Sequence, residues 1–130
     1  MLIYYKQKLA CFIISLLLLV NSLSYAQIAA DSTLGTVVTP KVTGTGTNFL
    51  ISQGRQEGNN LFHSFGDFNL HQSETATFTR PASSITNILA RVTGNKASFI
   101  DGQIQSDIPG ANLYFLNPNG IWFGEHARLN

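Results

Sequence analysis

The stretch NLYFLNPNGIWFG, residues 112–124, places a polar tetrapeptide between two apolar runs. Pro118 fixes φ near the value required at the second position of a type I turn, Asn119 suits the third position, and Gly120 suits the fourth. The segment from Asn117 to Gly120 is therefore predicted to form a tight turn. Because apolar residues of the kind found in strands lie on both sides of it, the turn is predicted to join two strands.

The amino-terminal 26 residues have the organisation of an export signal. Two lysines precede an apolar run, residues 9–20, and the polar segment behind this run ends in SYA at residues 24–26. Small side chains at the first and third of these positions are what signal peptidase reads, so cleavage is predicted between Ala26 and Gln27. The apolar run is shorter than the roughly 20 residues of a membrane span. We therefore expect residues 1–26 to be a signal peptide and not a stable membrane anchor.

Residues 27–130 contain no cysteine and carry almost no net charge. The single cysteine, Cys11, precedes most of the apolar run, which is the wrong order for a lipoprotein acylation site. Two of the eight basic residues and none of the seven acidic residues precede residue 27, so the mature segment has a net charge of −1. A chain so nearly neutral lacks the electrostatic footprint of a nucleic-acid-binding protein, and no run of basic residues indicates a membrane-surface patch.

Short strands are predicted along the whole mature segment. Ala76 and Phe78 alternate with threonines, as in a half-buried strand. Similar apolar pieces are bounded by Gly, Pro, Asp or Asn clusters, and they occupy residues 36–39, 48–52, 61–65, 85–92, 102–106 and 113–116. No window of eleven or more residues after Gln27 has a helical period. The mature chain is therefore predicted to be all-β.

The strand pattern alone leaves the architecture open. Sandwiches and barrels are built from hairpins, and the sequence has no two-residue Asn-Gly or Asp-Gly connection between clearly alternating strands. The stretches FGDF at residues 65–68, VTGN at 92–95 and FIDGQI at 99–104 resemble corners instead. A parallel β-solenoid uses such corners, and at roughly 20 residues per coil the mature chain would form about five coils. No strict repeat is visible, so periodicity does not decide between these architectures.

Three segments resemble a known family. RVTGNKASFIDGQIQSDIPGANLYFLNPNGIWFG, residues 91–124, resembles the amino-terminal secretion domain of two-partner-secretion exoproteins, the filamentous-haemagglutinin family. LGTVVTP at residues 34–40 and GNNLFHSFGDFNL at residues 58–70 resemble the opening of the same domain, especially in cyanobacterial-type members. The order and spacing of these segments behind an export signal carry the resemblance, which covers nearly all of residues 29–130.

The resemblance implies a fold and a function. The fold is a right-handed, single-stranded parallel β-helix, a pectin-lyase-like solenoid with amino-terminal capping strands, preceded by the signal-peptide helix. The function is that of a secretion-targeting module of an adhesin- or haemagglutinin-like exoprotein, with no enzymatic activity and no cofactor. Its partners would be the inner-membrane secretory translocon, signal peptidase, and an outer-membrane transporter with periplasmic modules and a β-barrel. The expected location is secreted or cell-surface, reached through the periplasm.

The sequence departs from the family pattern in two places. One branch of the family carries an Asn-Pro-Asn-Leu motif where residues 80–87 here read RPASSITN, so the chain is nearer the branch that has only the later motif. The family's domain also continues well past the NPNG turn, whereas this sequence ends at Asn130. We therefore expect the chain to be a fragment, the product of a split or decayed gene, or a truncated remnant.

The NPNG turn has two interpretations. In a solenoid a strand ends at a bend and the next strand begins in a new direction, so apolar residues flank a polar corner. Leu113, Phe115, Ile121 and Phe123 are accordingly predicted to point inward. The turn, residues 117–120, is either a purely structural corner or a direct contact with the transporter, and the sequence leaves both open.

No other motif indicates chemistry at a site. The three histidines lack metal-ligand spacing and are interpreted as surface or corner residues: His63, His71 and His126. Asp101 and Asp107 are interpreted as turn-capping residues rather than lyase carboxylates. The glycine-rich stretch at residues 43–48 lacks the features of a phosphate loop. No nucleophile elbow surrounds Ser64, Ser83 or Ser84. Tyr114 and Trp122 are interpreted as packing residues rather than sugar-stacking platforms.

Two other function classes stay open beside the secretion module. A β-helical carbohydrate-active enzyme would need acidic residues and arginine clustered on one face, and the seven acidic residues are scattered along the sequence. A self-standing structural protein of the envelope is compatible with the short length of the chain.

Overall fold

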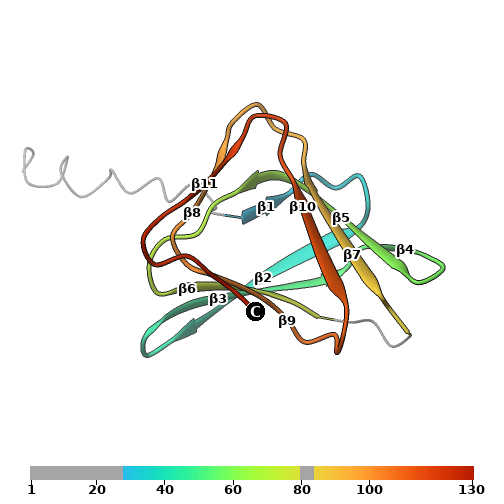
Figure 1. Ribbon diagram of the computed structural model, residues 1–130, viewed down its shortest axis with the longest axis horizontal. Coiled ribbons are helices and arrows are strands. Elements are labelled where there is room, and N and C mark those ends of the chain that lie inside the picture. The colour runs from blue at the N-terminus through green and yellow to red at the C-terminus, as the bar shows by residue number, and fades with distance from the viewer. Residues whose placement is uncertain (1–27, 80–83) are drawn as a thin grey trace, which may run out of the picture.

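The computed structural model describes residues 28–79 and 84–130 (Figure 1). The described residues form twelve strands and no helix, which confirms the all-β prediction. The predicted signal-peptide helix, the Ala26–Gln27 cleavage site and Ser83 lie outside the described residues. The strands are β1 (Ile28–Ala30), β2 (Thr36–Thr43), β3 (Gly46–Gln53), β4 (Arg55–Glu57), β5 (Asn60–Phe68), β6 (Glu74–Phe78), β7 (Asn87–Val92), β8 (Ser98–Ile100), β9 (Gln103–Ser106), β10 (Asn112–Leu116), β11 (Ile121–Phe123) and β12 (Arg128–Leu129).

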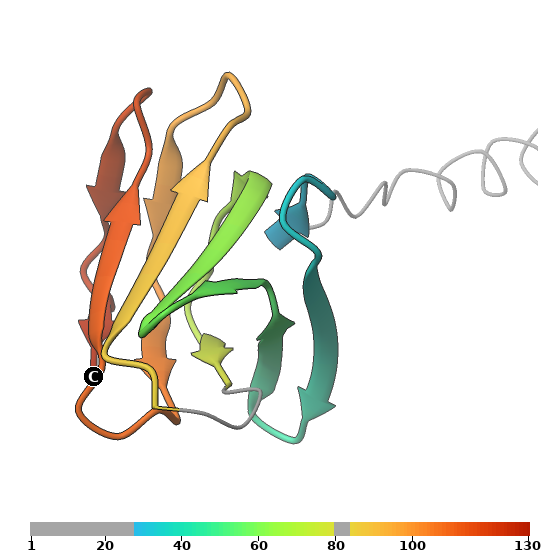
Figure 2. The ribbon, with the colours of Figure 1, turned by 90° about the vertical axis from the view of Figure 1, so that its right-hand side faces the viewer.

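The strands belong to three sheets that the chain visits in a repeating order. The first sheet has the order β2-β3-β6-β9-β12, the second has the order β1-β5-β7-β10 with β4 also paired to β5, and the third pairs β8 with β11. Figure 1 shows the three sheets as the sides of a triangle around a common interior. In Figure 2 the successive passes lie side by side, from β1 and β2 at one end to β10 and β11 at the other.

Pairing between successive passes is parallel and has a nearly constant spacing. Asn87 lies opposite Asn60, 27 residues earlier, and Asn112 lies opposite Asn87 at a separation of 25 residues. In the first sheet Gln105 lies opposite Thr77 at a separation of 28 residues. The spacing of roughly 20 residues expected from solenoid repeats is therefore too short. Long corner segments lengthen each pass, so the chain makes three passes and begins a fourth at β12, not five.

Two hairpins at the amino-terminal end were not predicted. β2 and β3 are joined by residues 44–45, and β4 and β5 are joined by Gly58 and Asn59. Gly58 has a φ of 60°, which supplies the left-handed conformation that a two-residue hairpin turn requires. The sequence search for Asn-Gly or Asp-Gly missed both because their loops read Gly-Thr and Gly-Asn. The glycine-rich stretch at residues 43–48 is thus a hairpin.

One predicted corner is wrong. Residues 65–68 lie within β5, because antiparallel pairing with β1 keeps this part of the chain extended. The pairing has a register shift between Ala29 and Ala30, and the corner itself follows at Asn69. The other two predicted corners are confirmed in position, since β7 ends at Val92 and a two-residue bend separates β8 from β9.

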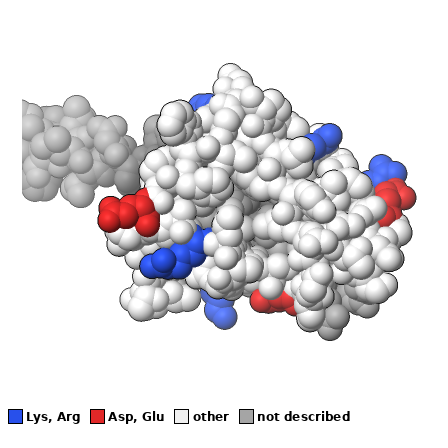
Figure 3. Space-filling model, viewed as in Figure 1, with Lys and Arg blue, Asp and Glu red and all other residues white. Residues whose placement is uncertain are grey.

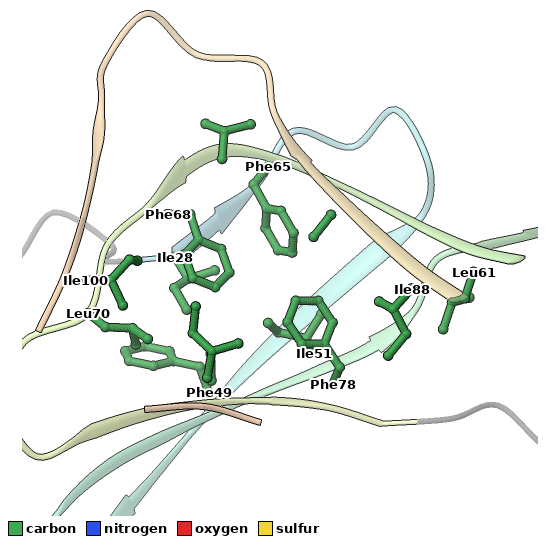
Figure 4. Close-up of a cluster of buried hydrophobic side chains, with 14 of the residues drawn as sticks. Ile28, Phe49, Ile51, Leu61, Phe65, Phe68, Leu70, Phe78, Ile88 and Ile100 are labelled. Carbon is green, nitrogen blue, oxygen red and sulfur yellow. The ribbon is translucent and has the colours of Figure 1, made fainter. Parts of the chain in front are cut away.

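Rows of apolar side chains fill the interior, one residue from each pass. Phe49, Ala76 and Ile104 form one such row across β3, β6 and β9, and all three are buried. Figure 4 shows large aromatic side chains meeting in the centre; the ring centroids of Phe65 and Phe68 are 5.1 Å apart. Burial of side chains in register with those of the next pass is the main stabilising term of such a stack.

Three of the four predicted inward positions around the NPNG turn are confirmed, whereas Phe123 is exposed at the open end of the molecule. Leu113, Phe115 and Ile121 pack against the buried core, and the rings of Phe68 and Phe115 are 4.7 Å apart. Phe123 lines an apolar hollow together with Phe115 and Ile121. Strand alternation turns the intervening residues outward.

Candidate functional site

The NPNG turn is the corner between β10 and β11. The backbone N–H of Gly120 donates to the carbonyl of Asn117 at 3.0 Å, which closes a four-residue turn. The Asn117 side chain accepts from the N–H of Asn119 at 2.9 Å, so the first asparagine also braces the turn from within. Gly120 has a φ of 106°, a conformation that residues with a Cβ rarely adopt. The four residue types each meet a local requirement of this corner.

Both asparagine side chains reach back to the corner of the preceding pass. Asn117 Nδ2 donates to the carbonyl of Lys96 at 3.0 Å and to Ser98 Oγ at 2.9 Å. Asn119 Nδ2 donates to the carbonyl of Gly94 at 2.8 Å, and the N–H of Ser98 donates to the carbonyl of Gly120 at 3.0 Å. The NPNG turn is therefore fastened to residues 94–98 by four hydrogen bonds.

The outer side of the same corner faces solvent. Pro118 and Asn119 are exposed, whereas Ile121 is half-buried, packs against the core and pairs with Ser98. None of the four turn residues titrates near neutral pH, so the corner itself has no acid–base chemistry. The corner sets the direction of β11 relative to β10 and leaves Pro118 and Asn119 exposed to solvent.

A polar cluster joins the amino-terminal segment to the first two passes. The Asp31 carboxylate accepts from Ser64 Oγ and Thr93 Oγ1, each at 2.6 Å, and from the N–H and hydroxyl of Thr33 at 2.9 and 2.7 Å. Arg91 Nε donates to Ser64 Oγ at 3.0 Å. Burial alone would raise the pKa of Asp31, but the hydrogen bonds from Ser64, Thr93 and Thr33 outweigh burial and hold it well below its usual value.

The three histidines lie in three separate places. His71 is exposed, as predicted, and His126 lies at the corner before β12, where its Nδ1 is 3.2 Å from Asp101 Oδ2. The backbone N–H of His126 donates to Asp101 at 2.9 Å and lowers the pKa of that carboxyl, so Asp101 caps a turn as predicted. His63 contradicts the prediction of a surface or corner residue, because it is fully buried on the inward side of β5.

Two aromatic residues predicted to pack are exposed instead. Trp122 is 69% exposed and Tyr114 is 51% exposed. Side chains alternate between the two faces of a strand, and each of these two residues falls on the outer face. Tyr114 lies in a row with Phe62 and Leu89 on the outer face of the second sheet, beside a ladder of asparagines. The ladder consists of Asn60, Asn87 and Asn112 and is joined by side-chain hydrogen bonds.

A hollow on this outer face has a volume of about 430 Å³. Apolar side chains from the second sheet and the segment before β2 line it together with the exposed ion pair of Arg55 and Glu57, whose nitrogen and oxygen are 2.8 Å apart. No sequence motif predicted this surface, since its parts are brought together by pairing across about 27 residues.

The end of the molecule at β10–β12 is apolar and open. A hollow of about 610 Å³ lies there, and Figure 3, which looks onto this end, shows charged groups mainly at the periphery. Phe123 is 58% exposed, and Leu116 and Leu129 are exposed as well. In residues 28–79 and 84–130, β10, β11 and β12 each lack a strand partner on the outer side.

Other kinds of site find no support in the described part of the chain. Ser64 is a hydrogen-bond partner of Asp31, Ser84 is exposed, and Asp107 is exposed, while no group of three or more potential metal ligands occurs among these residues. The same residues contain no helix of the length and hydropathy needed to cross a membrane.

Comparison with known proteins identifies the family. Residues 26–130 match the TPS secretion domain, and the search of curated proteins finds no match. The matched range contains every strand of the fold and the NPNG corner. It gives the chain a role in two-partner secretion, a transporter of that system as its general partner, and a secreted or cell-surface destination. The chain belongs to the family of TPS secretion domains.

Proposed function

We propose that the chain is the secretion-targeting module of an adhesin- or haemagglutinin-like exoprotein. The translocon carries it across the inner membrane, signal peptidase cuts between Ala26 and Gln27, and the periplasmic modules of an outer-membrane transporter then recognise it and pass it to the β-barrel. The match of residues 26–130 to the TPS secretion domain carries this proposal. The proposal assigns the domain no enzymatic activity.

The finer architecture is part of the proposal. The passes are the coils of a right-handed, single-stranded parallel β-helix, and β1 and β2 are its amino-terminal cap. Support comes from the three parallel stacks, which the chain enters in one order, and from the antiparallel pairing of β1 and β2 at the outer edges of β5 and β3. Antiparallel strands at that end cover edges that would otherwise be free to pair with another chain.

We assign the NPNG corner a structural role rather than a direct contact with the transporter. The side chains of Asn117 and Asn119 are both engaged with the preceding corner, at residues 94–98. A side chain that already donates to protein carbonyls has little left to offer a partner. Only Pro118 presents its side chain outward without such a bond.

The proposal also includes a longer parent protein. Phe123 and Leu129, at the apolar end, are exposed to an extent that further coils would relieve. Covering them contributes about 25 cal/mol per Å² of apolar surface removed from water. We therefore infer that this chain is the amino-terminal part of an exoprotein whose adhesin activity lies in later coils.

Export should depend on the transporter. For this test, the chain is joined to the coils that follow in a family member and is expressed with the transporter encoded beside that family member's gene. The fusion should appear outside the cells with Gln27 as its first residue. With a transporter that lacks its periplasmic modules it should stay in the periplasm. Amino-terminal sequencing and immunoblots of medium and periplasm measure both points. Equal release with the intact and the shortened transporter would contradict the proposal.

The apolar end should drive association of residues 27–130 on their own. We expect partial unfolding or oligomers at micromolar concentration, because the missing cover forgoes several kcal/mol of burial, a large part of a small domain's stability. The paired change Phe123→Gln and Leu129→Gln should reduce association, whereas Val42→Gln, at a residue 81% exposed on β2, should not. Sedimentation velocity measures this. A monomeric, cooperatively melting chain would contradict the inferred longer parent.

A further inference from the structure

His63 is the one titratable side chain that the described residues bury completely. Its ring centroid lies 5.4 Å from that of Phe78 and 6.3 Å from that of Phe65. Thr36 Oγ1 lies 3.3 Å from its Nδ1, and its Nε2 has no hydrogen-bond partner among the described residues. A Cβ at Gly54 would lie 2.8 Å from the ring, so the backbone closes over it on that side. The imidazole is therefore enclosed, and burial without a partner at Nε2 favours its neutral form.

β2 closes the interior over His63. Thr36 is the first residue of β2, and its hydroxyl accepts from the N–H of Ser64 at 3.1 Å while it contacts the imidazole. The remaining backbone pairing of β2 is with β3 alone, at the outer edge of the first sheet. β2 can consequently separate without breaking any parallel pair between successive passes.

A second attachment holds the chain just before β2. Asp31 accepts four hydrogen bonds from Thr33, Ser64 and Thr93. Ser64 lies on β5 and Thr93 directly follows β7, so the carboxylate fixes the segment before β2 to both strands. Asp31 loses this role only when it is protonated, and the low pKa that its hydrogen bonds produce places that step in strong acid. Above that pH range, His63 is the group of these two attachments whose protonation changes.

The charged groups that face the same region do not compensate a proton on His63. Arg55, Glu57 and Arg91 line the hollow that His63 also borders. Glu57 is paired with Arg55, and Arg91 donates to Ser64 and to Thr33. Two cations and one engaged carboxylate make this a poor setting for an imidazolium.

We propose that the contact between Thr36 and His63 makes the amino-terminal strands an acid-sensitive clasp. Acidification opens β2 from Thr36 onward, while Asp31 keeps the segment before β2 attached and β5, β6, β7, β9 and β10 stay paired. The clasp opens because burial behind β2 disfavours the charged imidazolium and leaves its Nε2 without an acceptor, whereas water satisfies both once β2 has moved away. The device is independent of transporter recognition and belongs to the fold itself.

The direction of the pH effect follows from linkage. Burial lowers the pKa of His63 from 6.5 to about 4 in the closed form. The free-energy preference for the closed form over the open form is therefore complete above pH 6.5. It is lost as the pH falls from 6.5 to about 4, because the open form binds the proton first. Between pH 7.5 and pH 4.5 the opening equilibrium should rise on the order of 70-fold.

Hydrogen exchange of the exported protein, corrected for intrinsic rates, tests the clasp. Amides of β2 should lose protection between pH 7.5 and 4.5 by roughly that factor, while amides of β6 and β7 keep theirs. His63→Gln should remove the pH dependence of β2, and His71→Gln, at an exposed histidine, should retain it. Loss of protection in all strands together, or an unchanged pH response in His63→Gln, would overturn the proposal.

The imidazole signals of the unaltered protein give a second measurement if His63→Gln does not fold. NMR titration should show His63 neutral in the closed form down to about pH 5 and exchanging with an open, protonated form below it. Proton uptake by His63 near pH 6.5 with β2 still protected would overturn the proposal.

Discussion

Replacing Gly102 with alanine should cost the protein about 3 kcal/mol or more of its unfolding free energy. Gly102 is buried at the corner between β8 and β9. A Cβ there would overlap the carbonyl oxygen of Glu74, the first residue of β6, and lie 2.7 Å from that of His71 in the corner before β6. Backbone atoms cannot rotate away as a side chain does, so two successive passes must separate where Thr75 pairs with Gln103.

Two other glycines separate crowding from backbone freedom. A Cβ at Gly44 meets nothing within 4 Å, and we expect Gly44→Ala to change stability by less than about 0.5 kcal/mol. Gly110 is equally open but has a φ of 71°, so Gly110→Ala should cost about 1 kcal/mol through conformation alone. Urea unfolding followed by circular dichroism measures all three. A Gly102→Ala value as small as that of Gly44→Ala would show that the corners are not tightly stacked.

The main strands were predictable because their side chains alternate over four or more residues. β6 and β7 show the alternation plainly, and the predicted segments overlap β2, β3, β5, β9 and β10 as well. β4, β8 and β12 have only two or three residues, too few for a period to appear. Their extended conformation comes from pairing with strands far away in sequence, which local propensity does not encode.

The NPNG turn was predictable and its contacts were not. Turn chemistry is local, so Pro118 and Gly120 identify the corner from the sequence. The partners of Asn117 and Asn119 lie up to 25 residues earlier. Two of them are backbone carbonyls, which carry no sequence signature, and the third is the hydroxyl of Ser98. His63 was misjudged for a similar reason: its burial depends on the inward phase of β5 and on a lid formed by Thr36.

Asn117→Ala should be the most damaging change in the NPNG corner, at about 2–4 kcal/mol of unfolding free energy. It removes two donated and two accepted hydrogen bonds, and it leaves the buried Ser98 hydroxyl without its described donor. Asn119→Ala loses the bond to Gly94 and should cost about 1 kcal/mol. Gly120→Val must adopt a φ of 106°, so we expect a loss of about 2 kcal/mol or more.

Asn117→Asp isolates the donated bonds, because it keeps the shape and the acceptor for Asn119 but points an oxygen at the carbonyl of Lys96. It should destabilise as much as alanine does, and the effect should persist in high salt, which screens only exposed charges. Thermal or urea unfolding of the variants ranks them by their loss of stability. An aspartate variant as stable as the original protein would show that the bonds to residues 94–98 contribute little.

Secretion assays on the same variants decide between the structural corner and a transporter contact. If the corner is structural, export should fall in the order of lost stability: Asn117→Ala most, Asn119→Ala less. Pro118→Lys alters the exposed outer side, where the described residues make no side-chain hydrogen bond, and should leave both stability and export nearly unchanged. A contact with the transporter predicts the reverse for this variant, namely blocked export of a stable domain. That result would move Pro118 from the scaffold of the corner to the recognition surface.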